Sequence, residues 1–240
     1  MSTAQSADCS STHTPQRLLD LRRTPVLTAA LVVVTAVVSV VGLLSPPLLA
    51  ALQRAPAGLH GQAWRWVTSL LVQDGGVFGT VSNLAFLLVI GAAAEQVIQR
   101  RAMLGLYLTA GLVGQAAGYL WQPFGAGNSV AVCGLAGALA WTLHRHDVPR
   151  RTSTALALWL GALLATWWAP LIAVGITGAV LDRCITLRPT RRRTLLVGAT
   201  ATTAAALTAA ANVHGPALAL GVLVGALPAI RCSGASSPAA

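Results

Sequence analysis

Residues 78–98 read FGTVSNLAFLLVIGAAAEQVI, and Arg100 and Arg101 follow almost at once. A run of about 20 apolar residues is long enough for an α-helix to cross the hydrocarbon layer of a bilayer. Glu95 is the only charged residue within this run. The stretch therefore predicts a transmembrane helix that ends beside a pair of arginines.

Further apolar runs occur along the chain at 26–45, 102–121, 129–143, 154–186, 194–211 and 215–230. The chain is 55% hydrophobic and only 9% charged, whereas soluble domains are about 25% charged. The alternating pattern of membrane-barrel strands is absent from the sequence. Composition and spacing together predict an all-α fold, a polytopic transmembrane helical bundle.

The basic residues are distributed unevenly between the connections. All 16 are arginines, and they favour alternate connections, as the positive-inside rule requires. With the N-terminus inside, only Arg54 and Arg65 fall outside. The pattern predicts a multi-pass cell membrane protein with both termini in the cytoplasm. The other 14 arginines fall inside: Arg17, Arg22, Arg23, Arg100, Arg101, Arg145, Arg150, Arg151, Arg183, Arg188, Arg191, Arg192, Arg193 and Arg231.

The apolar runs also suggest a domain organisation. We expect a disordered cytoplasmic tail over residues 1–24, a transmembrane domain over 25–231, and a disordered C-terminal tail over 232–240. Because both ends of the 154–186 run carry inside arginines, we expect this run to enter the membrane and return as a hairpin. This interpretation gives eight helices. A single long tilted helix would give seven, but its far end would lie on the wrong side.

Four motifs follow one another along the chain. They are GQAWRWVT at 61–68, NLAFLLVIGAAAE at 83–95, GNSVAVCGLAGA at 127–138, and a late helix carrying Gly221 and Gly225. In this order the motifs resemble those of the rhomboid family of intramembrane serine proteases. The resemblance implies a six-helix core, with the 154–186 hairpin as an addition to it.

The resemblance implies a set of site residues and partners. The family uses a serine and a histidine from two helices, with an asparagine side chain that donates to the oxyanion. Carried over to this sequence, Ser129 is the nucleophile, His214 the base and Asn83 the oxyanion donor. The substrates would be transmembrane segments of membrane proteins within the lipid bilayer. No cofactor, no metal and no nucleic acid is expected, and the four cysteines share no metal-binding spacing.

Two residues depart from the family pattern. Val130 replaces the second glycine of the Gly-x-Ser-Gly segment, which adds bulk beside the nucleophile. Gly79 stands where many rhomboids carry a histidine that helps to hold the oxyanion. These departures motivate an alternative function, a proteolytically inactive rhomboid-like pseudoprotease that binds membrane helices. A transporter or channel is disfavoured because ionisable groups are almost absent from the predicted spans.

The position of the base is ambiguous in the sequence. The usual family pattern is a histidine with small residues three and seven positions later. If Gly221 and Gly225 are those residues, the base position holds Leu218 and the dyad is broken. If Ala217 and Gly221 are the pair, the base is His214, and Gly225 continues a seam of small residues that lets two helices approach closely.

Helix lengths favour His214. From Ser129 to the first inside arginine is about 24 Å of helix at 1.5 Å per residue. From His214 to the inside arginine that follows is about 25 Å, but from Leu218 only about 20 Å. His214 would then lie level with Ser129. Against this, Pro216 suits the first turn of a helix, which would leave His214 in the preceding loop.

Two further polar residues are expected to have structural roles. We expect Glu95 to tie helices together or to pair with Arg100 or Arg101, because a lone carboxylate within lipid is costly. We expect Arg65 to order the long connection between the first two spans.

Overall fold

This computed structural model describes residues 24–145, 150–165 and 189–227, and over these ranges the fold consists of helices joined by turns and loops. This confirms the predicted fold class. Within those ranges the only β feature is an isolated bridge between Arg54 and Gly125. The helices are α1 (Val26–Leu44), α2 (Pro46–Leu52), the 3-10 helix η1 (Pro56–Leu59), α3 (Arg65–Thr68), α4 (Gly76–Val97), α5 (Arg100–Trp121), α6 (Ser129–Arg145), α7 (Arg150–Ala165), α9 (Pro189–Ala209) and α10 (His214–Ala226).

The predicted spans each fall on a helix, although the runs at 154–186 and 215–230 are only partly within the described residues. Among the described residues, α1, α4 and α5 are long and apolar enough to cross a membrane, and α10 is a shorter apolar helix. The first limb of the predicted 154–186 hairpin falls on α7. Its second limb and both predicted tails, apart from Thr24 at the end of the first, lie outside the described residues.

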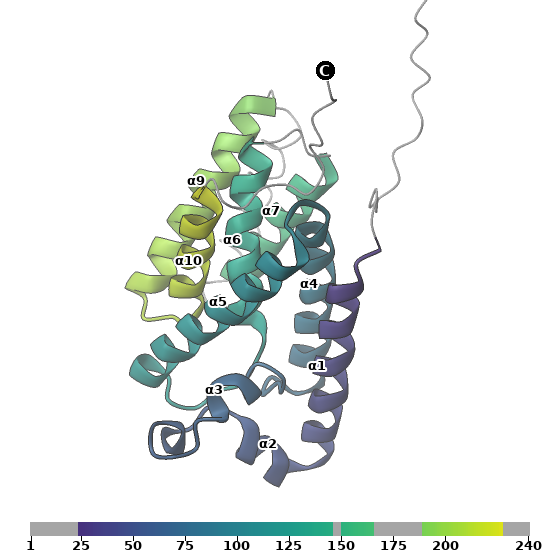
Figure 1. Cartoon of the computed structure of the whole chain (residues 1–240). Coiled ribbons are helices and arrows are strands. Elements are labelled where there is room, and N and C mark those ends of the chain that lie inside the picture. The colour runs from purple at the N-terminus through teal and green to yellow at the C-terminus, as the bar shows by residue number, and fades with distance from the viewer. Residues whose placement is uncertain (1–23, 146–149, 166–188, 228–240) are drawn as a thin grey trace, which may run out of the picture.

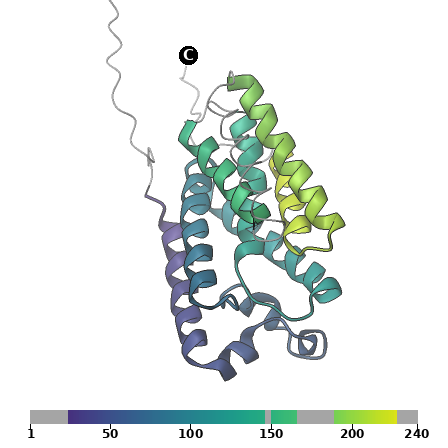
Figure 2. The same ribbon diagram turned by 180° about the vertical axis from the view of Figure 1, so that it is seen from behind.

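Helix α6 forms the centre of the bundle, and nearly all of its residues are buried. It packs against α10, α5, α4 and α9, while α1 packs against α4 at the edge (Figures 1 and 2). α1 leaves Val33 and Val37 exposed, as expected for a helix that faces lipid. The short helices α2 and α3 lie together at one end of the bundle.

Small residues bring α6 and α10 into close contact. A Cβ on Gly221 would overlap the carbonyl oxygen of Gly134, and a Cβ on Gly137 would lie 2.6 Å from the carbonyl oxygen of Leu218. Gly225 packs in the same way against Ala138. This seam fixes the register of α10 on α6.

A buried carboxylate joins α1 to α4, as expected for Glu95. Its oxygens accept hydrogen bonds from the backbone nitrogens of Leu27 (3.1 Å) and Thr28 (2.8 Å) and from the Thr28 hydroxyl (2.8 Å). Arg100 adds an ion pair at 2.8 Å. The first backbone N–H groups of a helix have no acceptor within it. Glu95, on the neighbouring helix α4, supplies acceptors for the N–H groups at the start of α1.

Arg65 orders the connection between α1 and α4, also as expected. Its guanidinium donates to the carbonyl oxygens of Ala50 and Gln53, both at 2.7 Å, and to the Gln62 side chain at 2.6 Å. These bonds join α2 to the segment that leads into α3.

Candidate active site

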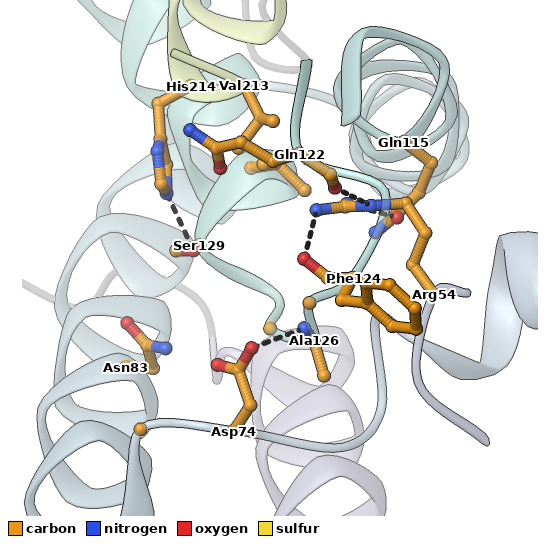
Figure 3. Close-up of a pocket in the computed structure, with 14 residues that line it drawn as sticks. Arg54, Asp74, Asn83, Gln115, Gln122, Phe124, Ala126, Ser129, Val213 and His214 are labelled. Carbon is orange, nitrogen blue, oxygen red and sulfur yellow. Dashed lines mark hydrogen bonds between the residues drawn. The ribbon is translucent and has the colours of Figure 1, made fainter. Parts of the chain in front are cut away.

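Ser129 and His214 meet where α6 and α10 both begin. The Ser129 Oγ lies 2.9 Å from Nε2 of His214, although the two residues are 85 positions apart (Figure 3). The α6–α10 seam produces this contact because it sets both helix starts at the same end of the bundle. Leu218 is fully buried one turn further along α10. The structure therefore places His214, and not Leu218, beside the serine.

Asn212 holds the imidazole of His214 from the other side. The Asn212 Oδ1 lies 2.7 Å from Nδ1 of His214 and accepts from the His214 backbone nitrogen at 2.9 Å. An amide oxygen can only accept hydrogen bonds, so Nδ1 carries the proton. Nε2 is then the acceptor for the Ser129 hydroxyl. His214 is the first residue of α10, and Asn212 supplies the fixation that a histidine at a helix start would otherwise lack.

The turn between α9 and α10 sets the position of Asn212. The backbone nitrogen of Asn212 donates to the carbonyl of Leu207, and that of Ala211 donates to the carbonyl of Thr208. This pair of bonds is a Schellman motif, which requires a left-handed residue after the helix. Ala211 takes that role with φ 53°, a conformation that glycine adopts at lower cost.

Asn83 lies on α4, on the facing side of the site. Its Nδ2 donates to Oε1 of Gln73 at 2.6 Å, and Nε2 of Gln73 donates to Oδ1 of Asn128 at 3.0 Å. Asn128 directly precedes Ser129. Gln73 thus links the Asn83 amide to the loop that carries the serine. The Asn83 amide also has a second N–H, which the bond to Gln73 does not use.

Arg54 holds the loop that leads into α6. Its guanidinium donates to the carbonyl of Gln122 at 2.9 Å, to the carbonyl of Phe124 at 3.4 Å and to Oε1 of Gln115 at 2.6 Å (Figure 3). Its backbone also pairs with that of Gly125 in both directions. Burial lowers the pKa of the Arg54 guanidinium, and the negative charge of Asp74 acts in the opposite direction.

A polar cavity of about 220 Å³ opens beside the serine and histidine. Arg54, Asp74, Gln115 and Gln122 line it together with Ser129, His214 and Asn83. The Asp74 carboxylate accepts from the backbone nitrogen of Ala126 at 2.8 Å, so the loop before Ser129 is held on two sides. The cavity gives polar molecules such as water a place next to the Ser129 hydroxyl.

The two departures from the family pattern have different structural outcomes. Val130 points at α5, where Gly114 makes room for it: a Cβ on Gly114 would lie 2.7 Å from Cβ of Val130. The larger side chain of Val130 is therefore accommodated against α5, at Gly114. At Gly79, by contrast, a Cβ would meet no atom within 4 Å, so the space on that side of the site is open.

Sequence reasoning singled out Ser129, His214 and Asn83, and the structure brings all three to the same cavities. It missed Asn212, Gln73 and Arg54. Asn212 had a local signal, because the side chain of an asparagine often accepts a hydrogen bond from the backbone nitrogen two residues later, which here is that of His214. Within the described residues, no group of three His, Cys, Asp or Glu side chains could hold a metal ion.

The comparison with known families comes from the sequence. Residues 60–184 match the Rhomboid domain, which is just over half of the 240-residue chain. The matched stretch contains Asn83 and Ser129, whereas His214 lies beyond its end. No curated protein matches the chain. The length of the domain match shows that this membrane protein belongs to the rhomboid family.

Proposed function

We propose that this protein is an intramembrane serine endopeptidase that cleaves transmembrane segments of other membrane proteins. The observation that carries the proposal is the 2.9 Å contact between Ser129 Oγ and His214 Nε2. A serine hydroxyl reacts as a nucleophile when a base within hydrogen-bond reach can take its proton. Asn212 supports the role of His214, because it fixes the tautomer in which Nε2 is the hydrogen-bond acceptor.

The proposed reaction has two steps. In the first, Ser129 Oγ bonds to the scissile carbonyl carbon while its proton passes to Nε2 of His214. The C–N bond then breaks, and the imidazolium returns this proton to the leaving amine. In the second step, water loses a proton to His214 and attacks the acyl ester. The ester C–O bond breaks, and Ser129 regains its proton.

The negative charge on the carbonyl oxygen needs donors in both steps. Ser129 begins α6, and the backbone N–H groups at a helix start favour a nearby negative charge. Asn83 would add its second amide N–H while the first stays bonded to Gln73. No histidine assists from position 79 in this chain, so the Ser129 backbone and Asn83 would carry this role.

The arginine distribution supports an orientation for the site. Arg145 ends α6 at the opposite end from Ser129, and the positive-inside rule assigns that end to the cytoplasm. The site would then lie near the outer face of the cell membrane. The chain would consist of a cytoplasmic tail, residues 1–24, a membrane domain, residues 25–231, and a short cytoplasmic C-terminal tail, residues 232–240.

An inactive pseudoprotease that binds membrane helices is the second candidate. The observation that favours it is Gly79, which leaves the oxyanion side of the site open. The hydrogen bond from Asn83 to Gln73 also favours the pseudoprotease, because it uses one of the two N–H groups of the Asn83 amide. Such a protein would hold a substrate helix beside Ser129 without cleaving it.

A cleavage assay in lipid vesicles distinguishes the two candidates. The purified full-length protein, Ser129→Ala and His214→Ala are each mixed with a panel of model transmembrane substrates. Ser45→Ala and His60→Ala serve as matched controls, because neither residue lines the cavities beside Ser129 and His214. We expect cleavage by the wild type and both controls and none by the two site variants. Reaction of the wild type with a fluorophosphonate probe should be lost in Ser129→Ala.

The opposite result supports the pseudoprotease. In that case the wild type cleaves no member of the panel and does not react with the probe, yet still binds the substrate helices.

A further inference from the structure

The guanidinium of Arg54 is a buried positive charge beside the proposed site. Arg54 is only 4% exposed, and its acceptors are neutral: two backbone carbonyl oxygens and Oε1 of Gln115. No carboxylate of the described residues lies within 4 Å of this guanidinium; the ion pair that they form at that distance joins Arg100 to Glu95. Because a buried charge without a counter-ion is costly, an anion that reached Arg54 would be held strongly.

The polar cavity of about 220 Å³ brings this charge next to the proposed nucleophile. Arg54 and Ser129 both line it, and the guanidinium is directed toward the side on which Ser129 and His214 lie (Figure 3). Two glycines make room for it: a Cβ on Gly118 would overlap the guanidinium, and a Cβ on Gly125 would lie 2.7 Å from Nη2. The cavity has the volume of roughly seven molecules of liquid water, so it can hold a carboxylate side chain.

Asp74 also lines this cavity but neutralises Arg54 only in part. Asp74 is exposed, and its carboxylate accepts from the backbone nitrogen of Ala126 at 2.8 Å. Its charge acts on Arg54 from beyond ion-pair distance. Since water and salt screen an exposed charge much more than a buried one, the inner part of the cavity stays electropositive.

We propose that this cavity binds an acidic side chain, aspartate or glutamate, of the substrate residue next to the scissile bond, and that Arg54 selects it. The hydrogen bonds of Arg54 use one N–H on each nitrogen, so each terminal nitrogen keeps a second N–H for a carboxylate oxygen. Hydrogen bonds between two ionised groups are stronger than those to an amide. The inference rests on the proposed protease function and adds the class of substrate residue that the site accepts.

The test uses the full-length protein in lipid vesicles at about pH 7, where glutamate is ionised. Transmembrane substrates carry either glutamate or glutamine, which has the same shape without the charge, at each of the three residues on either side of the cleaved bond. At one position, we expect kcat/KM for glutamate to exceed that for glutamine by about 10-fold to 100-fold. If glutamine substrates are cleaved at least as well at every position, the inference is wrong and the protease function stands.

Gln115→Glu tests whether Arg54 is the source of the preference. Oε1 of Gln115 accepts from Nη1 of Arg54 at 2.6 Å, so a carboxylate here keeps the bond and neutralises the charge. We expect this variant to cleave the glutamate and glutamine substrates equally well. Both substrates are compared on the same variant, so a change in activity common to the two does not affect the comparison.

Gln62→Glu is the matched control. Oε1 of Gln62 accepts from Nε of Arg65, also at 2.6 Å, but neither residue lines a cavity beside Ser129. This variant should keep the wild-type preference for glutamate. If Gln115→Glu keeps the preference as well, Arg54 does not select the substrate and the inference is wrong.

Asp74→Asn tests the electrostatic origin of the preference from the rim of the cavity. The asparagine oxygen can still accept from Ala126, but the negative charge that repels an acidic substrate is gone. We expect the advantage of glutamate over glutamine to grow by about 2-fold to 5-fold. An unchanged or smaller advantage would contradict the proposed role of charge in this cavity.

A binding measurement separates the inference from the chemistry. Ser129→Ala is titrated with the same substrate helices, and the dissociation constants are compared by fluorescence transfer. We expect tighter binding of the glutamate helix at one position, and loss of the difference when Gln115→Glu is added. Equal dissociation constants would overturn the inference, whereas absence of all cleavage by the wild type would count against the protease function alone.

Discussion

The side-chain oxygen of Asn212 accepts from both the backbone nitrogen and the ring Nδ1 of His214, at 2.9 Å and 2.7 Å. The first bond fixes the backbone, and the second fixes the ring and its tautomer. An amide thus occupies the place that a carboxylate takes in a Ser-His-Asp triad. The arrangement makes Asn212 a positioning residue for the proposed base.

Asn212→Ala should lower kcat by about 10-fold to 100-fold, because a freed imidazole spends less time with Nε2 facing Ser129, and general-base catalysis contributes at least that much. KM should stay near the wild-type value. Asn212→Asp should retain most of the activity, since a carboxylate accepts the same two hydrogen bonds. Steady-state kinetics in vesicles provide the measurement, and an Asn212→Ala enzyme with unchanged kcat would contradict the assignment.

Arg54→Lys should destabilise the loop before α6. An ammonium group cannot reach the Gln122 and Phe124 carbonyls and Gln115 together, as the planar guanidinium does. With buried acceptors left unpaired, we expect a loss of about 3 kcal/mol in the free energy of unfolding and a fall in kcat/KM. Unfolding in mixed micelles measures the first effect.

Arg191→Lys is the control for this substitution, because Arg191 is an exposed arginine of α9. Its free energy of unfolding should stay within about 0.5 kcal/mol of the wild type. Equal stability of Arg54→Lys and the control would show that the loop does not depend on the guanidinium.

Gly114→Ala should destabilise the protein by about 2 kcal/mol, because the new methyl group would press on Val130 and force the packed helices apart. Adding Val130→Ala should recover part of this loss, and a double-mutant cycle measures the coupling. Gly105→Ala on the same helix meets no neighbour and should be stabilising by up to about 1 kcal/mol. Additive effects of the Gly114 and Val130 substitutions would contradict direct packing.

Ala211→Gly should stabilise the turn between α9 and α10 by about 1 kcal/mol, since glycine adopts the left-handed conformation without the Cβ clash. Ala205→Gly, at an exposed alanine in the interior of α9, should have the opposite sign and a similar size. Thermal unfolding of the two variants beside the wild type checks both signs. Destabilisation by both substitutions would mean that the turn gains nothing from glycine.

The sequence was sufficient to predict a helical membrane bundle, because long apolar runs are a local pattern. Helix lengths and the small residues of α10 also favoured His214, and the comparison of helix lengths needed only Arg145, which ends α6, and Arg231, which follows α10 in the sequence. Both arguments for His214 assume regular helices after Ser129 and His214, and the chain forms such helices there as α6 and α10.

The supporting residues of the site were harder to predict. Arg54 contacts Gln115 at a separation of 61 residues, and Gln73 bridges Asn128 at a separation of 55. A lone polar residue in a connection carries no periodic signal, so its partner emerges only when the helices are packed. The arginine pattern assigned Arg54 to a connection between two predicted spans but gave no hint that its side chain is buried.

The order of the two site residues along the chain has a consequence for biosynthesis. On the proposed mechanism, the nucleophile leaves the ribosome with α6, whereas its base arrives only with α10, after a further 85 residues. A nascent chain that has inserted the helices up to α9 would still lack the base and so could not cleave a peptide bond. On this mechanism, the ability to hydrolyse a peptide bond would be acquired only when α10 is inserted beside α6.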